Sequence, residues 1–171
     1  TCLVGCGGIA AVHGSVLTSG IDTEFVAAAD IKPEKAQTYA ENFHTKPYPS
    51  LESMLDAEKP DVLHICTPHY LHVPMTIYAL ERNINVFMEK PPAISFDQLE
   101  ELKKAAAKSE AQLGFCYQNR YNASIRAAKD LIDSGKAGKV LGARAFVTWC
   151  RGAAYYTESG WRGSLKTEGG G

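Results

Sequence analysis

The chain has 171 residues, of which 45% are hydrophobic and 22% are charged, and its formal net charge is -1. Such values are typical of a globular protein, and without a basic run they argue against a nucleic-acid or anionic-membrane partner. No stretch reaches the roughly 18 consecutive apolar residues of a membrane span, so we expect a cytoplasmic protein.

The cysteines are odd in number and scattered, and none forms a C-x-x-C pair. They are Cys2, Cys6, Cys66, Cys116 and Cys150. Four of them lie in or beside expected strands, which suits buried thiols, and the five histidines are equally dispersed. We therefore expect neither a disulfide framework nor a metal site.

The first motif is a glycine-rich turn. An apolar run over residues 1–4 leads directly into Gly5-Cys6-Gly7-Gly8-Ile9-Ala10. This is the strand, turn and helix start of a dinucleotide-binding unit in its G-x-G-x-x-A form. Gly5 would make the tight turn, Gly7 would let the backbone approach a pyrophosphate, and Ala10 would keep the helix close to the sheet. The alternative is an ordinary tight turn.

An acid follows the second apolar run, residues 25–29. Asp30 stands where a dinucleotide-binding unit places the carboxylate that accepts from a ribose diol. It could also cap the helix expected over residues 33–43, and the two roles are compatible. A carboxylate repels a 2′-phosphate, so NAD is favoured, although Lys32 and Lys35 keep NADP as an alternative.

Strand and helix patterns continue to alternate as far as Cys116. Helices are expected over residues 9–19, 33–43, 50–56, 73–82 and 95–108, and further strands over residues 62–66, 85–88 and 112–116. Such alternation predicts an α/β fold, in which right-handed crossovers join a doubly wound parallel sheet.

Two short segments follow strands of this sheet, and ligands bind outside the carboxyl ends of such strands. Thr67-Pro68 comes after residues 62–66, and Glu89-Lys90 comes after residues 85–88. The Lys90 ammonium could stabilise alkoxide charge on a reacting hydroxyl or polarise a carbonyl. The alternatives are an ion pair between Lys90 and Glu89 or a surface lysine, and a purely local turn at Thr67.

The pattern changes near residue 119, where a second domain is expected to begin. Residues 122–134 predict an amphipathic helix, and residues 140–149 alternate as a half-covered strand does. We assign residues 1–118 to the cofactor domain and 119–171 to the start of an α+β domain. Because the chain opens inside a strand and ends in three glycines, we expect a piece of a longer protein.

Five motifs occur in an order that resembles the Gfo/Idh/MocA oxidoreductases, the family of glucose–fructose oxidoreductase and inositol dehydrogenase. They are the glycine turn with His13, Cys66-Thr67-Pro68 with His72, Glu89-Lys90-Pro91, Gly114-Phe115 with Arg120, and Trp161-Arg162-Gly163 before a triple glycine. The resemblance covers nearly the whole chain.

This resemblance implies a Rossmann domain that binds NAD or NADP, and a second domain that forms a homo-oligomer. It places Lys90 beside the nicotinamide and the hydroxyl of a sugar or polyol substrate. It also raises the expected frequency of a cis Lys90-Pro91 bond above the roughly 5–6% of ordinary X-Pro bonds. Further cofactor contacts are assigned by match to Thr67, Pro68, His72, Glu89, Trp161 and Arg162. For His72 the alternatives are a solvent-facing ring or a helix cap, and for Trp161 and Arg162 they are a core tryptophan and a solvated arginine. In the family, a catalytic aspartate and histidine follow the glycine stretch that here ends at Gly171.

Two other functions are compatible with the same scaffold. One is a non-catalytic NAD(P)-sensing regulatory protein, and the other is a glycosidase or lyase in which NAD is reduced and then reoxidised. Net reduction of the cofactor separates a dehydrogenase from both alternatives.

Overall fold

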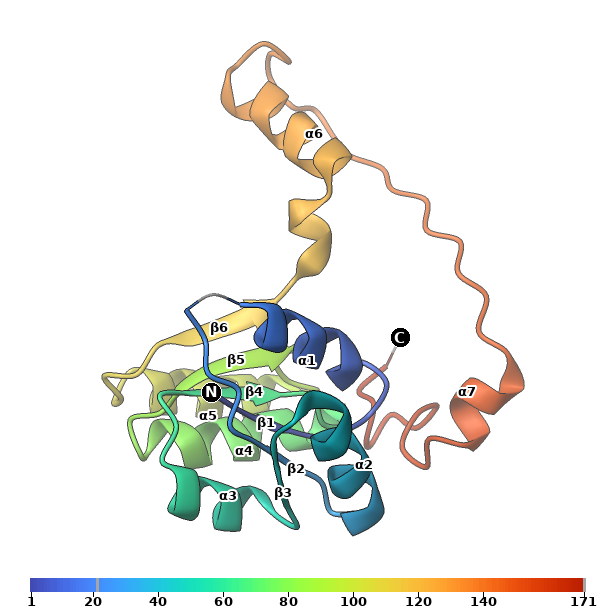
Figure 1. Ribbon diagram of the computed structural model, residues 1–171. Helices are drawn as coiled ribbons and strands as arrows, with labels where there is room; N and C mark the ends of the chain where they lie inside the picture. The colour runs from blue at the N-terminus through green and yellow to red at the C-terminus, as the bar shows by residue number, and fades with distance from the viewer. Residues whose placement is uncertain (21, 171) are drawn as a thin grey trace. The chain divides into compact units, whose positions relative to one another are not determined.

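Six parallel strands form one sheet in the order β3-β2-β1-β4-β5-β6 (Figure 1). The computed structural model describes residues 1–20 and 22–170. The strands are β1 (Cys2–Val4), β2 (Ala27–Ala29), β3 (Lys46–Tyr48), β4 (Val62–Ile65), β5 (Asn85–Glu89) and β6 (Leu113–Cys116). The chain starts in the centre and winds first to one edge and then to the other, so the predicted doubly wound parallel sheet is confirmed.

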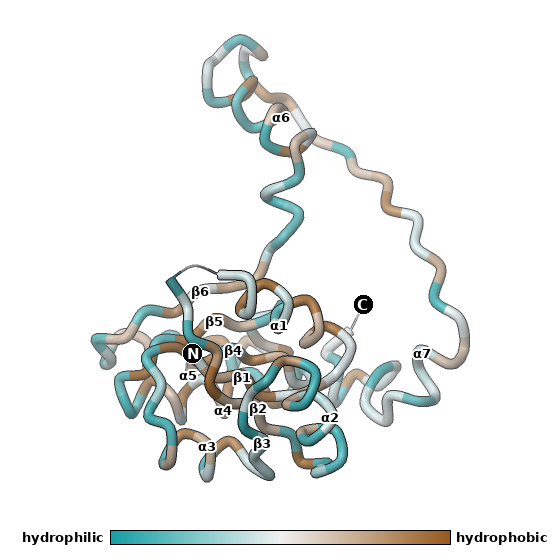
Figure 2. Tube along the Cα trace, viewed as in Figure 1, coloured by the Kyte–Doolittle hydropathy of each residue, from teal (hydrophilic) through white to brown (hydrophobic). Residues whose placement is uncertain are grey.

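Helices cover both faces of the sheet. They are α1 (Ala10–Ser19), α2 (Pro33–Phe43), α3 (Leu51–Glu58), α4 (His72–Leu80) and α5 (Phe96–Ala106), and a short 3₁₀ turn, η1, spans His69–Leu71. The larger apolar cluster packs α3, α4 and α5 against one face, and the smaller packs α1 and α2 against the other. Figure 2 shows hydrophobic residues along β1 and β4, in the centre of this core.

Short-range signals set the helix ends that the sequence predicted. The Ser50 hydroxyl accepts a hydrogen bond from the Ser53 N–H at 3.1 Å, and that of Ser95 accepts from the Gln98 N–H at 3.2 Å. Pro33 occupies the first turn of α2, where its missing N–H has no helical partner to lose. The two serine caps and Pro33 confirm the predicted starts of α3, α5 and α2.

The edge strand β3 was not located from the sequence. It has three residues, of which Pro47 lacks an N–H, and two are exposed. Such a segment carries neither the length nor the apolar alternation by which a strand is recognised. It nevertheless pairs with β2, where the Lys46 N–H donates to the Val26 carbonyl at 3.0 Å.

The structure divides into two units, one of residues 1–116 with 161–171 and one of residues 117–160. The second contains the 3₁₀ turn η2 (Gln118–Tyr121) and two helices, α6 (Ala123–Asp133) and α7 (Ala153–Thr157). The strand predicted over residues 140–149 is wrong, because this segment has no strand structure. Alternation predicts which side chains share a face, but a strand also needs a partner, and the described part of this unit holds no other strand.

Among the residues that the structure describes, no helix is both long enough and apolar enough to cross a membrane.

Candidate functional site

The glycine turn after β1 contains two kinds of glycine. Gly5 has φ +92°, and a Cβ there would lie 2.8 Å from backbone atoms of Cys66 and Thr67. Only glycine satisfies both conditions without strain. A Cβ on Gly7 or Gly8 would meet nothing within 4 Å, so these exposed residues leave an open backbone surface that a pyrophosphate could approach.

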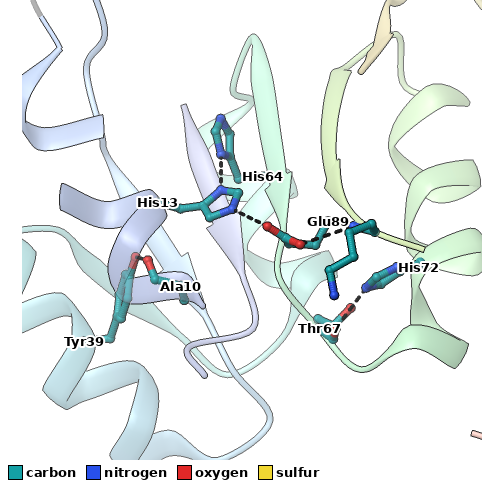
Figure 3. A network of polar contacts seen from close by, with 8 residues as sticks. Ala10, His13, Tyr39, His64, Thr67, His72 and Glu89 are labelled. Atoms are coloured by element: carbon teal, nitrogen blue, oxygen red, sulfur yellow. Dashed lines mark hydrogen bonds and ion pairs between the residues drawn. The ribbon is translucent and has the colours of Figure 1, made fainter. Parts of the chain in front are cut away.

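The N-terminus of α1 begins at this turn and differs from those of α3 and α5. No side chain caps it, and its first turn contains no acidic residue. Its N–H groups and partial positive charge therefore face the open side of the glycine turn, as anion binding requires. Tyr39 of α2 holds this end of the helix, because its hydroxyl donates to the Ala10 carbonyl at 2.8 Å (Figure 3).

Asp30, at the end of β2, joins two segments. One carboxylate oxygen accepts from the Cys6 N–H of the glycine turn at 2.9 Å, and the other accepts from the Lys32 N–H at 2.9 Å. The carboxylate is thus oriented beside the turn, with lone pairs left for ribose hydroxyls. Burial, reinforced by the charge of Asp30, raises the pKa of the Cys6 thiol to about 12, so Cys6 remains a neutral packing group.

The loop after β4 contains Thr67 and Pro68. The Thr67 hydroxyl oxygen is buried and has no hydrogen-bond partner among the described residues. A buried hydroxyl of this kind is usually satisfied. The backbone nitrogen of the same residue lies next to Gly5 and limits its position.

His72, the first residue of α4, is fully buried. One ring nitrogen lies 2.9 Å from the Thr67 carbonyl oxygen, and the other lies 2.8 Å from that of Pro91 (Figure 3 shows the first contact). The ring therefore does not face solvent, and it contacts backbone from two neighbouring loops.

A buried polar network lies beneath the end of β5. Glu89 is 5% exposed, and a carboxylate oxygen lies 3.1 Å from His13 Nε2, while His13 Nδ1 lies 2.9 Å from His64 Nδ1 (Figure 3). Burial tends to raise the pKa of Glu89, but hydrogen bonds from His13 and Cys116 hold the net pKa below its ordinary value. Burial, with the charge of His13, lowers the pKa of His64 to about 4.

Three members of this region also offer metal-ligand atoms. Those of His13, Glu89 and Cys116 lie within 4.8 Å of one another, a grouping that their sequence spacing does not reveal. Hydrogen bonds among the three account for their proximity.

Lys90 is exposed directly after β5 and is followed by a cis peptide bond to Pro91, the isomer that is frequent in the family it resembles. Its N–H lies 3.3 Å from the second carboxylate oxygen of Glu89. Glu89 forms its ion pair with His13, and the described residues record no ion pair between Glu89 and Lys90. The ammonium group is thus exposed beside the carboxyl ends of β4 and β5.

Trp161 lies against the loop after β4. The ring centres of Trp161 and His69 are 4.6 Å apart in an edge-on arrangement, and the Arg162 guanidinium lies 4.4 Å from the Trp161 ring centre. His69 also bonds to the Glu168 carbonyl oxygen at 2.9 Å. The segment that begins at Trp161 therefore packs beside the Thr67–Pro68 loop.

The structure brings most of the predicted site residues to one edge of the sheet. Gly5 to Ala10, Asp30, Thr67 and Lys90 follow β1, β2, β4 and β5, and His72, Glu89 and Trp161 pack behind or beside them. Sequence reasoning missed His64. Its signal was a polar residue at an interior position of the apolar strand β4.

Comparisons with known proteins agree with this geometry. Residues 1–117 match the model of the Gfo/Idh/MocA oxidoreductase family, described as an NAD-binding Rossmann fold. D-glucoside 3-dehydrogenase of Escherichia coli is 30% identical over 161 residues, covering 93% of this chain and 44% of that protein. A 2,7-anhydro-N-acetylneuraminate hydratase of Mediterraneibacter gnavus is 31% identical, over 81% of this chain and 37% of that protein.

Among solved structures, the WlbA dehydrogenase of Chromobacterium violaceum, in complex with NADH and UDP-GlcNAcA, superposes with a TM-score of 0.89. It is 31% identical, and the match covers 97% of this chain and 48% of that one. The chain thus spans less than half the length of each of these three relatives.

Proposed function

The chain belongs to the Gfo/Idh/MocA family of NAD-binding oxidoreductases, and on this premise we propose that the protein oxidises a hydroxyl-bearing carbon of a sugar or polyol. The observation that carries the proposal is the meeting, at one sheet edge, of an open glycine turn, the Asp30 carboxylate and the exposed Lys90 ammonium. When bound, NAD supplies the hydride-accepting ring.

The residues present fit this cofactor. The open backbone of Gly7 and Gly8 and the uncapped start of α1 would receive the pyrophosphate. Asp30 would accept from the ribose hydroxyls, and its negative charge disfavours the additional phosphate of NADP. The unsatisfied Thr67 hydroxyl supports a polar contact at the same edge.

Lys90 would act on the substrate rather than on the cofactor phosphates. Its ammonium group would donate to the reacting hydroxyl and stabilise the negative charge that develops when the proton leaves. Glu89 would hold the Lys90 backbone from beneath, because its carboxylate is fixed by His13 and lies 3.3 Å from the Lys90 N–H.

The remaining assignments rest on the family resemblance. Pro68 and His72 would shape the loop over the cofactor, and the Trp161–Arg162 pair would cover it from the side. Residues 161–171, which the sequence assigned to the second domain, group with the first unit, so residues 119–160 would begin the domain that selects the substrate and joins subunits into a homo-oligomer.

Cofactor binding tests the first half of the proposal. Isothermal titration of the chain with NAD and with NADP should give saturable binding of NAD and weaker binding of NADP. Absence of NAD binding, with the fold intact by circular dichroism, would overturn the assignment of the glycine turn.

Turnover tests the second half. The whole protein would be mixed with NAD and a panel of glucosides, inositols and nucleotide sugars, and the absorbance of reduced nicotinamide followed. Lys90→Met should lower kcat about 100-fold or more, because it removes a charged transition-state donor, and should leave NAD affinity nearly unchanged. Lys108→Met, on the exposed surface after α5, is the matched control. Full turnover by Lys90→Met would refute the role of Lys90.

A second candidate is a reaction without net oxidation, favoured by the similarity to a protein named as a hydratase. In such a reaction the substrate would be converted while reduced cofactor does not accumulate. Product analysis of the same panel by mass spectrometry, in parallel with absorbance, distinguishes the two.

A further inference from the structure

Both hydrogen-bond contacts that the described residues make with the His72 ring are with acceptors. Its nitrogens lie 2.8 Å and 2.9 Å from the carbonyl oxygens of Pro91 and Thr67. Both distances are those of ordinary hydrogen bonds, and a backbone carbonyl oxygen can only accept. Both contacts can therefore be hydrogen bonds only if each ring nitrogen carries a proton.

A neutral imidazole cannot meet this demand. It carries one N–H, and its other nitrogen presents a lone pair, which would face the lone pairs of a carbonyl oxygen. Only the imidazolium donates from both nitrogens. Because His72 is fully buried, no water at the ring surface replaces the missing donor.

The two carbonyls belong to the loops that form the proposed site. Thr67 follows β4, and Pro91 follows Lys90 at the end of β5. A ring that donates to both sets the separation between the Thr67 hydroxyl and the backbone that carries Lys90. The described structure records no direct hydrogen bond between these two loops apart from this bridge.

The charges around the ring act in opposite directions. Burial is the largest effect and holds the pKa of His72 below its ordinary value, although the two carbonyl acceptors and the Glu89 carboxylate favour the charged ring. Lys90 disfavours it. His69, whose ring centre is 5.6 Å away, is the neighbouring titratable group on the preceding turn, and burial also lowers the pKa of His69.

We propose that His72 is a positioning residue that, as an imidazolium, donates to Thr67 and Pro91 and so holds the cofactor loop and the Lys90 loop in register. The inference rests on the proposed function, because these loops matter together only if a cofactor and a substrate meet between them. Loss of the proton removes one of the two hydrogen bonds. The cofactor loop and the Lys90 loop then move independently of each other.

The first experiment needs no variant and no cofactor. Long-range ¹H–¹⁵N spectra of the ¹⁵N-labelled chain distinguish an imidazolium from either neutral tautomer, and they would be recorded between about pH 5 and pH 8. We expect both His72 nitrogens to carry protons at the acidic end of the range. A neutral His72 ring throughout would overturn the proposal, whether or not NAD binds.

The second experiment measures NAD affinity over the same pH range. Affinity should fall about fivefold, the factor for one hydrogen bond of about 1 kcal/mol net strength, as His72 loses its proton, with the midpoint seen in the spectra. If the ring stays charged throughout, affinity should show no such step. His72→Gln should bind NAD more weakly and without the step, whereas His69→Gln should retain it.

Salt separates positioning from simple charge attraction. A step caused by exposed charges acting on the cofactor phosphates would shrink at high ionic strength, whereas a step caused by the lost hydrogen bond of the buried His72 ring would persist. A His72 titration that leaves NAD affinity unchanged, or a step that salt abolishes, would refute the positioning role. Failure of NAD to bind at any pH would instead refute the proposed function, and the spectra would still report the ring's protonation.

Discussion

The pH dependence of folding should reveal the partly buried His64 ring. In the folded chain the pKa of His64 falls from its ordinary 6.5 to about 4, first because of burial and then because of His13. The unfolded chain therefore takes up a proton near pH 6.5, whereas the folded chain resists until about pH 4. Stability is complete above the unfolded pKa and is lost as pH falls through this window.

The size of the effect follows from the pKa difference. One pH unit is worth about 1.4 kcal/mol, so lowering the pKa of His64 from 6.5 to about 4 corresponds to about 3 kcal/mol of unfolding free energy. This is a large share of the 5–15 kcal/mol typical of native proteins. The pKa of Glu89 is also lowered in the folded chain, so protonation of Glu89 destabilises the protein in acid as well. The contribution of His64 must therefore be isolated by comparing the wild type with a variant that lacks His64.

The comparison uses His64→Asn, whose amide can place a polar atom near the Nδ1 position that contacts His13. Urea unfolding at a series of pH values gives the free energy for both proteins. The wild type should lose about 2 to 3 kcal/mol more than the variant between pH 7 and pH 4. His44→Asn, at an exposed helix end, should not change the pH slope. A constant difference between wild type and His64→Asn at all pH values would refute the reasoning.

Four further substitutions test the glycine turn, the ribose carboxylate and a helix cap. Gly7→Ala should fold with unchanged urea stability, since its Cβ meets nothing, but should bind NAD at least about tenfold more weakly by titration, since the Cβ occupies the pyrophosphate space. Gly5→Ala should lose about 2 to 4 kcal/mol of stability, because a positive φ and a backbone clash add. Asp30→Asn should weaken NAD binding about tenfold in the same titration, because the amide loses the charge that favours the ribose hydroxyls. Ser50→Ala should lower the urea-unfolding free energy by about 1 kcal/mol through the lost cap of α3.

Each of these results can fail in a distinct way. Normal NAD affinity in Gly7→Ala would place the pyrophosphate elsewhere, and a stable Gly5→Ala would contradict the close approach of the turn to Cys66. Unchanged NAD affinity in Asp30→Asn would remove the carboxylate from the ribose site. An unchanged Ser50→Ala would mean that another donor or water replaces the cap.

Features encoded within a few residues were predictable from the sequence. The caps at Ser50 and Ser95 and the proline at the start of α2 each act within one helical turn, and their effect does not depend on distant parts of the chain. The glycine turn has a local sequence pattern, although the backbone of Cys66 and Thr67 also limits Gly5. The doubly wound order followed from these elements, because parallel strands need crossover connections of one hand.

Features that depend on distant partners were not predictable. The ring of His13 meets His64 across 51 positions and Glu89 across 76, and no periodicity in the sequence links such residues. The prediction of a strand over residues 140–149 was wrong for a related reason, because an alternating pattern does not supply a partner strand. The fully buried His72 likewise depends on the loop after β5, which carries Pro91.

The two main-chain hydrogen bonds to Asp30 bear on how cofactor preference could change. Its carboxylate is oriented by the Cys6 and Lys32 N–H groups before any ligand arrives. The Asp30 side chain therefore loses its rotamer entropy when the chain folds rather than when the ligand binds. For a flexible side chain this entropy is worth about 0.5 to 1.5 kcal/mol. The hydrogen bond from the Cys6 N–H also couples ribose recognition by Asp30 to the conformation of the glycine turn. A substitution at Asp30 alone would therefore loosen the turn while altering selectivity, and an adaptation toward a phosphorylated ribose would need a second change that restores a partner for the Cys6 N–H.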